Sequence, residues 1–153
     1  MPDPEGLVLA YDYGLARIGV AVGQALTCSA QPLAVVACRD GCPDWPAMDR
    51  LHGEWRPARV VVGQPLNMDD SASAMSRRAA SFAQELAARY ALPVALHDER
   101  LSSREARQRF AERRAGGRAR AAQASGMDAI AAAVILESWL GAAATAPDGG
   151  EAF

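Results

Sequence analysis

The sequence contains no lysine, because all sixteen of its basic residues are arginine. A mechanism that needs a lysine base, a Schiff base or a phosphate-binding lysine is therefore excluded, and a Walker-type phosphate loop with it. Cysteine is scarce as well, with only Cys28, Cys38 and Cys42. Three cysteines do not make a disulfide framework, and reduced thiols are a better interpretation of them than a zinc site.

Signals for export and for membrane insertion are also missing. The sequence has no charged-then-apolar leader, and no uncharged apolar run is long enough to cross a bilayer. We therefore expect a cytoplasmic protein. The length of 153 residues predicts a single domain with a core at about 7–140 and flexible tails at 1–6 and 141–153.

Charge is unevenly distributed, although the formal net charge is only −2. Eight arginines stand between residues 100 and 120, against the two acids Glu105 and Glu112. A local basic patch of this kind can bind phosphate on a mildly acidic protein. A solvated helix face explains the individual arginines equally well, since Glu105 can pair with Arg109 one turn later.

The order of the apolar patterns predicts an α/β domain. Continuous apolar runs that end in turn residues, such as Leu7–Asp12 and Arg59–Gly63, are typical of strands buried on both faces. Gly19 and Gly23 share one face of the second strand, which indicates that another element packs closely there. The expected strands are 7–12, 17–23, 32–37, 59–63 and 93–99, and the expected helices are 45–55, 73–90, 102–114 and 125–140.

Helix ends and buried faces follow from the same patterns. Asp44 and Ser125 are expected to cap the first and last helices, and residues 39–44 are expected to form a turn. On the second helix, Arg77 and Arg78 lie away from the predicted buried face. The residues expected to face the core are Trp45, Met48, Leu51 and Trp55 on the first helix and Met75, Ala79, Phe82, Leu86 and Tyr90 on the second.

Carboxylates stand where the predicted strands end. Asp12 ends the first strand and the pair Asp98–Glu99 ends the fifth, while Asp128 stands near the start of the last helix. If strands one, four and five are parallel, their exits meet at one edge, where open sheets bind ligands. Each acid also has a structural explanation. Asp12 can form an Asp turn, Asp128 can interact with the helix dipole, and Arg100 can pair with the strand-end acids.

Three carboxylates at one edge would repel each other unless a cation joined them. Hard oxygen ligands favour Mg²⁺ or Mn²⁺, and two such ions can activate water and stabilise an in-line phosphoryl displacement. The pattern therefore favours a metal-dependent site for phosphoryl transfer. His97 is expected to be a half-buried strand residue, and Asn67 is a turn former that could also contact phosphate.

Five segments in this order resemble the YqgF family, also called RuvX. They are Asp12-Tyr13-Gly14 and the segments at 17–22, 63–68, 98–102 and 128–132. The family includes proteins described as Holliday-junction resolvases and as pre-16S rRNA nucleases. The resemblance spans about residues 7–140 and implies a ribonuclease H-like fold, with a five-stranded mixed sheet in the order 3-2-1-4-5 and flanking helices.

The resemblance also implies a site. Asp12, Glu99 and Asp128 match the family's acidic triad, which implies that these catalytic residues bind one or two Mg²⁺ or Mn²⁺ ions. The family commonly has Thr-Lys after its first motif, where this chain has Leu15-Ala16 followed by Arg17. We expect nucleic-acid contacts at Arg17, Asn67, Arg100, Arg104, Arg118 and Arg120.

We therefore predict a metal-dependent nuclease that acts on structured RNA, as a monomer or a homodimer. The family role would be processing of the 5′ end of pre-16S rRNA in ribosome biogenesis. One alternative is a Holliday-junction resolvase acting on four-way DNA, which needs two sites facing a two-fold axis. A second is a non-catalytic RNA-binding factor, and a third is a nucleotide phosphohydrolase, ranked last because no second glycine-rich phosphate loop is visible.

Overall fold

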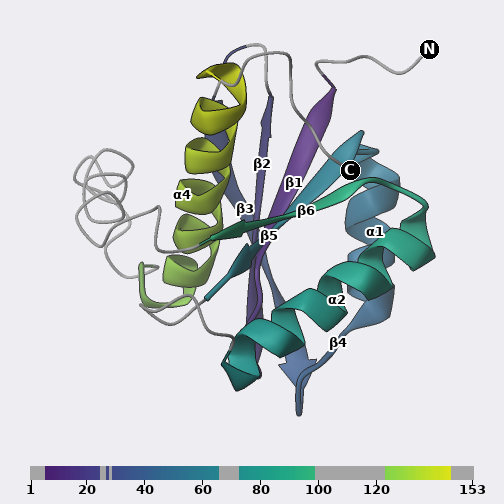
Figure 1. Cartoon of the computed structure of the whole chain (residues 1–153). Helices are drawn as coiled ribbons and strands as arrows, with labels where there is room; N and C mark the ends of the chain where they lie inside the picture. The colour runs from purple at the N-terminus through teal and green to yellow at the C-terminus, as the bar shows by residue number, and fades with distance from the viewer. Residues whose placement is uncertain (1–5, 25–26, 28, 66–72, 99–122, 146–153) are drawn as a thin grey trace.

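A mixed sheet forms the centre of the computed structural model, which describes residues 6–24, 27, 29–65, 73–98 and 123–145. Helix α4 covers one face of the sheet, and α1 and α2 cover the other (Figure 1). The strands are β1 Leu7–Asp12, β2 Arg17–Gln24, β3 Ser29–Arg39, β4 Cys42–Pro43, β5 Arg59–Gln64 and β6 Val94–Asp98. The helices are α1 Trp45–Trp55, α2 Ala74–Tyr90 and α4 Gln123–Thr145.

The strand order is β4-β3-β2-β1-β5-β6. Strands β1, β2 and β3 form an antiparallel meander, whereas β1, β5 and β6 are parallel to one another. Without β4 this is the predicted 3-2-1-4-5 order, so the expected fold is confirmed. Strand β4 lies within the predicted turn at 39–44, because a two-residue strand is too short to show any periodicity. It pairs with the end of β3 through Cys38 and Arg39.

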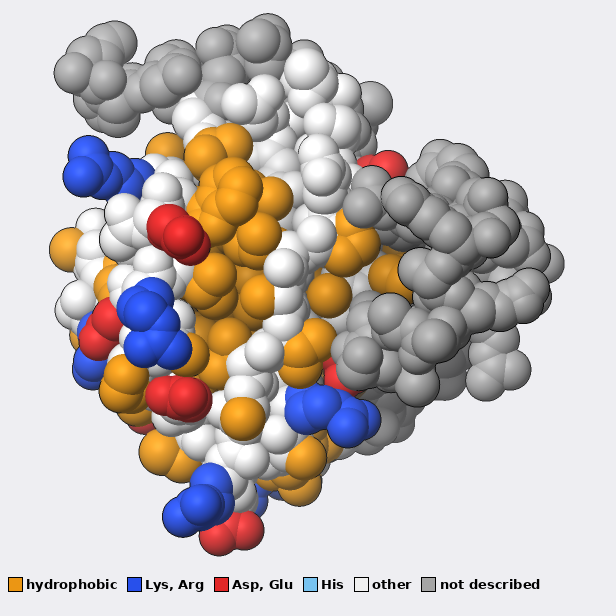
Figure 2. All heavy atoms as spheres, turned by 180° about the vertical axis from the view of Figure 1, so that it is seen from behind, with side chains coloured by type: hydrophobic (Ala, Val, Ile, Leu, Met, Phe, Trp, Pro, Cys, Tyr) orange, Lys and Arg blue, Asp and Glu red, His pale blue; other side chains and the backbone are white. Residues whose placement is uncertain are grey.

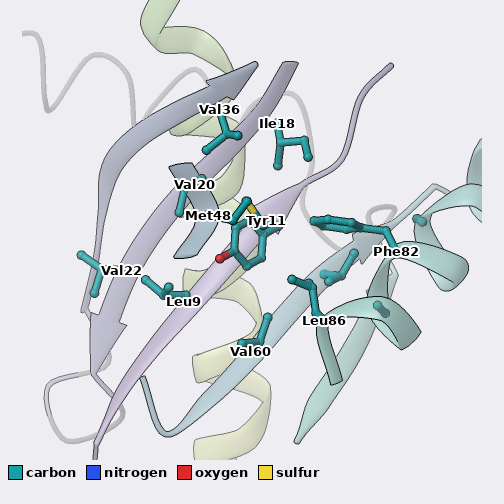
Figure 3. Packing of buried hydrophobic residues seen from close by; sticks show 13 residues of the cluster. Leu9, Tyr11, Ile18, Val20, Val22, Val36, Met48, Val60, Phe82 and Leu86 are labelled. Carbon is teal, nitrogen blue, oxygen red and sulfur yellow. The ribbon is translucent and has the colours of Figure 1, made fainter. Parts of the chain in front are cut away.

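The central strand β1 separates two apolar clusters. Val8 and Ala10 pack with α4 on one face, and Leu9 and Tyr11 pack with α1 and α2 on the other. Figure 3 shows the second cluster, in which the Tyr11 ring lies among side chains from the sheet and both helices. Strands β2 and β5 pair with both edges of β1, and the helices on the two sides of the sheet bury the side chains of its middle residues.

Helices α1 and α2 each begin directly after a capping residue, and the cap of α1 is the predicted one. The Asp44 side chain accepts a hydrogen bond from the Ala47 backbone at 3.3 Å, and α1 has the predicted bounds. Ser73 and Ser76 form a reciprocal capping box at the start of α2. Most of the predicted core positions on these helices belong to the second cluster, with Met48 fully buried.

Helix α4 is longer than its predicted span of 125–140. It begins at Gln123, so Ser125 lies inside the helix and is not its cap. It continues through Thr145, so residues 141–145 are not part of a loose tail. Alanine is the best helix former, and no proline interrupts the alanine-rich continuation. The expected helix at 102–114 lies outside the described residues.

A hollow of about 400 Å³ lies between β3 and α1, and its apolar lining includes Val35, Ala47 and Leu51. The face seen in Figure 2 also has a broad area of hydrophobic side chains, with arginine and acidic side chains around it. In the described part of the chain, no helix has the length and apolar character needed to cross a membrane.

Candidate functional site

Three parallel strands end at one edge of the sheet. Strand β1 ends at Asp12, β5 at Gln64 and β6 at Asp98. Because β1 is paired with β5, and β5 with β6, these exits are neighbours in space. The edge where the sequence predicts a site is therefore present, with Asp12 at the end of β1, next to the exit of β5.

Asp12 lies on the α4 face of the sheet. Side chains alternate along a strand, and Val8 and Ala10 of the same strand pack against α4. Asp12 is also paired with Gly19 of the neighbouring antiparallel strand, at a Cα separation of about 4.5–5.5 Å. Directly paired residues share a face, so Gly19 presents its open side to α4 as well.

Helix α4 approaches the sheet closely at Gly19. A Cβ atom at Gly19 would overlap the backbone carbonyl of Asp128 and lie 2.9 Å from the nitrogen of Ala129. The backbone at Asp128 thus rests on the residue paired with Asp12. The sequence predicted a close approach at Gly19 and Gly23. Helix α4 makes it at Gly19, whereas the carbonyl of Ser29 in β3 lies nearest to Gly23, followed by Leu136 of α4. Asp12 and Asp128 are therefore brought to the same face and the same edge.

An arginine holds the Asp128 carboxylate. Arg17, the first residue of β2, donates from Nε to Oδ2 of Asp128 at 2.8 Å. The side chains of Arg17 and Asp128 are 62% and 30% exposed, so the pair lies on the surface, where ion pairs contribute little to stability. Its consequence is orientation, since it fixes the carboxylate beside Gly19. It also shows that a cation fits at this position.

Asp128 is not in the first turn of its helix, because α4 begins five residues earlier at Gln123. The macrodipole acts mainly on the first turn, so the helix-dipole explanation of this acid is weakened. The contact with Arg17 and the packing on Gly19 are its observed surroundings.

The rest of the predicted site lies outside the described residues. The third predicted metal ligand, Glu99, directly follows the last residue of β6. The predicted nucleic-acid contacts that are not described are Asn67, Arg100, Arg104, Arg118 and Arg120. Among the residues that are described, no three His, Cys, Asp or Glu side chains form a group able to hold a metal.

The two described carboxylates do fit a divalent metal in their chemistry. Asp12 and Asp128 offer hard oxygen atoms, which Mg²⁺ and Mn²⁺ prefer. They sit at the carboxyl edge of the sheet, and a cationic group already contacts one of them. A third oxygen ligand is needed to complete the set, and Glu99 remains the predicted source.

His97 has a structural partner rather than a catalytic position. It is paired with Gly63 and lies 6% exposed, with Nε2 2.9 Å from Oγ of Ser138 in α4. Burial lowers the pKa of His97, and the charge of Asp98 opposes that shift. His97 is a strand residue as expected, but it is buried rather than half-buried.

A polar network on the opposite face was missed by the sequence analysis. The Tyr11 hydroxyl lies 2.8 Å from Nε2 of His52, whose ring stacks on Tyr90 with centroids 3.6 Å apart. The Tyr90 hydroxyl donates to Asp49 at 2.7 Å, and Arg89 makes two further hydrogen bonds to that carboxylate. The network joins α1 to α2 and β1, away from the carboxyl edge, and its role is structural. No local pattern pairs residues so far apart in the chain.

Two kinds of comparison relate this chain to known proteins. A family model described as "RuvX: Holliday junction resolvase" matches residues 6–142. A protein of Xanthomonas campestris pv. campestris (strain B100) named "Putative pre-16S rRNA nuclease" is 55% identical over 139 residues, which cover 91% of this chain and 90% of that protein. A protein of the same name from Xanthomonas oryzae pv. oryzae (strain PXO99A) has the same identity and coverage.

Solved structures share the fold at low sequence identity. T. thermophilus RuvC in complex with a Holliday junction substrate superposes with a TM-score of 0.58 at 20% identity, covering 92% of this chain and 98% of that one. The fowlpox virus resolvase in its complex with Holliday junction DNA gives 0.55 at 9% identity, covering 89% and 97%. At such low sequence identities, these structures show a shared fold and nothing more.

Proposed function

This chain belongs to the RuvX family, and on that premise we propose that it is a metal-dependent nuclease that hydrolyses phosphodiester bonds of structured RNA. The proposed substrate is the 5′ end of precursor 16S rRNA, during ribosome biogenesis. Family membership and the 55% identity to proteins named as pre-16S rRNA nucleases support this choice of substrate.

The observation that supports the chemistry is that Asp12 and the backbone of Asp128 both lie beside Gly19 of β2. The two acids are far apart in the sequence, so this shared neighbour is a product of the fold. A purely structural role does not need two acids on one face of a strand exit. Like charges at such a position favour a bound cation.

We propose that Asp12, Glu99 and Asp128 hold the metal and are the catalytic residues. His97 lies two residues before Glu99 and faces α4, the side on which Asp12 and Asp128 lie. One or two Mg²⁺ or Mn²⁺ ions bound there would supply the charge that activates water and stabilises the oxygens of an in-line displacement.

Arginine replaces the family's usual lysine as the residue that binds phosphate. Arg17 lies at the edge of the site with its side chain 62% exposed, so its guanidinium can reach a backbone phosphate once it leaves Asp128. The same role is proposed for Arg100, Arg104, Arg118 and Arg120, with Asn67 as a further contact. A planar guanidinium binds two phosphate oxygens at once, which a lysine ammonium does not.

A second candidate is cleavage of four-way DNA junctions. The description of the matching family model favours it. That reaction needs two sites related by a two-fold axis, so a protein that is a monomer with and without junction DNA would count against it.

A side-by-side cleavage assay tests both candidates. Wild-type protein and Asp12→Asn are incubated with a labelled rRNA precursor and with a four-way junction, each in Mg²⁺ or Mn²⁺. We expect cleavage of the precursor by wild type only. If neither substrate is cut but RNA still binds, the protein is a non-catalytic RNA-binding factor. Equal cutting by Asp12→Asn would overturn the proposed site.

A further inference from the structure

We propose that a polar hollow beside the carboxyl edge, on the α2 face of the sheet, binds a backbone phosphate of the nucleic acid next to the segment that is cut. The inference rests on the proposed function, because it extends the path of the same substrate. It adds Arg77, Arg78 and Tyr13 to the residues that contact nucleic acid.

The hollow begins one residue from the candidate active site. It has a volume of about 490 Å³ and lies between the exit of β1, the turn before β4 and the first half of α2. Tyr13 directly follows Asp12, and its ring packs on Phe82 of α2 with centroids 5.0 Å apart. A nucleic-acid strand that crosses the sheet edge at Asp12 would therefore reach this hollow next. Its lining includes Tyr13, Gly41, Arg77, Arg78, Ser81 and Glu85.

Hydrogen bonds hold the walls of the hollow together. The Tyr13 hydroxyl donates to the carbonyl of Gly41 at 2.6 Å, and the Gly41 backbone donates to the carbonyl of Leu15 at 3.1 Å. Gly41 has a φ of +82°, and a Cβ there would lie 2.9 Å from both Nη1 of Arg78 and the Tyr13 hydroxyl. Glycine thus lets a guanidinium and a hydroxyl come together over a fixed turn.

The Arg78 guanidinium lies against the same wall, beside Gly41 and the Tyr13 hydroxyl. Burial raises the pKa of Tyr13, and a hydrogen bond with Arg78 opposes that rise. The raised pKa keeps the tyrosine a neutral hydroxyl at physiological pH, and its oxygen is an acceptor available to the guanidinium beside Gly41. An arginine positioned in this way loses less freedom when it binds a phosphate than an arginine that is free to rotate.

The electrostatics of the hollow favour an anion. Arg77 and Arg78 are exposed near the start of α2, and no acid stands in the first turn of that helix. The helix starts at the carboxyl edge, since Ser73 donates from its hydroxyl to the carbonyl of Pro65 just after β5. The helix dipole therefore adds partial positive charge at the same end. The acid in the lining, Glu85, lies two turns further along α2 and its charge acts on Tyr13, so the two arginines outnumber it in the hollow.

Binding of an RNA hairpin with a single-stranded 5′ tail tests the hollow. The tail carries fluorescein, the protein carries Asp12→Asn to prevent cleavage, and Kd is measured by anisotropy at several salt concentrations in Mg²⁺. In this background Arg77→Gln/Arg78→Gln is compared with Arg50→Gln/Arg56→Gln, which removes the same charge from exposed positions on α1 and at its end. Circular dichroism checks the folding of each variant.

We expect the Arg77/Arg78 pair of substitutions to raise Kd by about tenfold, a loss of roughly 1.4 kcal/mol. Loss of one phosphate contact should reduce the slope of log Kd against log salt by about 0.7. Arg77→Lys/Arg78→Lys should keep the slope and recover part of the affinity. The α1 control should change neither quantity.

The failures can be told apart. If the protein in the Asp12→Asn background binds no RNA, the hollow falls together with the proposed function. If it binds RNA and the Arg77→Gln/Arg78→Gln variant binds as well as the α1 control, the hollow alone is overturned.

Discussion

Arg17 and Asp128 stand 111 residues apart in the sequence, yet Nε of Arg17 lies 2.8 Å from Oδ2 of Asp128. The contact joins the first residue of β2 to the part of α4 that rests on Gly19. It places a positive charge beside the carboxylate of Asp128, which the family resemblance predicts to be a metal ligand. Arg17 was predicted to contact nucleic acid, and its observed partner is the candidate site itself.

Removing the Arg17 charge should strengthen metal binding, because Arg17 and a divalent ion compete for Asp128. We expect Arg17→Gln to tighten the binding of Mn²⁺ by up to about fivefold, the range that exposed ion pairs allow. Titration calorimetry measures this without any substrate. Arg17→Lys keeps the charge and should behave like wild type, and Arg56→Gln at the end of α1 should have no effect. An unchanged affinity in Arg17→Gln would show that the two cations do not compete.

Gly19 should not tolerate a side chain. Its Cβ would overlap the carbonyl carbon and oxygen of Asp128. Both of these are backbone atoms, so α4 would have to move. We expect Gly19→Ala to lower the free energy of unfolding by about 1–3 kcal/mol, as overpacked cores do, and to weaken metal binding. Gly53→Ala is the matched control, since nothing lies within 4 Å of a Cβ on this residue of α1. It should stabilise the protein by about 0.5–1 kcal/mol. Urea unfolding of both variants compares them, and equal stabilities would contradict the close packing at Gly19.

The free energy of unfolding should decrease as the pH is lowered, because His52 is buried in its neutral form. Burial lowers the pKa of His52 to about 4, and the charge of Asp49 only partly opposes this. The pKa in the unfolded chain is about 6.5, so between these values the unfolded state binds a proton that the folded state does not. The free energy of unfolding should be steady above pH 6.5 and should decrease by about 2–3 kcal/mol as the pH falls to 4.

Chemical denaturation across this range checks the role of His52. His52→Gln keeps a hydrogen-bonding group near the Tyr11 hydroxyl but cannot titrate, so the pH dependence should become shallower. Part of the slope should persist, because burial lowers the pKa of His97 as well. A slope as steep as that of wild type would assign the effect to other groups.

Local patterns were enough to predict most of the elements. The apolar run that ends at Asp12 and the stripe from Trp45 to Trp55 define β1 and α1 at their observed bounds. Gly19 and Gly23 showed which face another element would approach, although not which element. Strand β4 and the true ends of α4 were missed, because a two-residue strand has no period and alanine-rich ends have no stop residue.

Long-range partners could not be predicted in the same way. Arg17 contacts Asp128, and His52 contacts Tyr11, because of how the layers pack and not because of spacing along the chain. The triad was proposed from a family resemblance, and its members Asp12 and Asp128 do lie on one face of one edge. Glu99 stays a prediction.

A divalent metal should stabilise the fold, because the proposed ligands are assembled only in the folded state. At a concentration about 100 times its Kd, Mn²⁺ should add roughly 2.7 kcal/mol and raise Tm by about 5–10 °C. Asp12→Asn should lose most of this gain, since it removes a ligand at the centre of the site. Asp49→Asn is the control, because Asp49 pairs with Arg89 and Tyr90 on the other face of the sheet and should leave the metal response intact. Thermal melts with Mn²⁺ and with a chelator measure the difference. An equal response in all three proteins would place the bound metal elsewhere, whereas a loss in Asp12→Asn alone would tie it to the carboxyl edge.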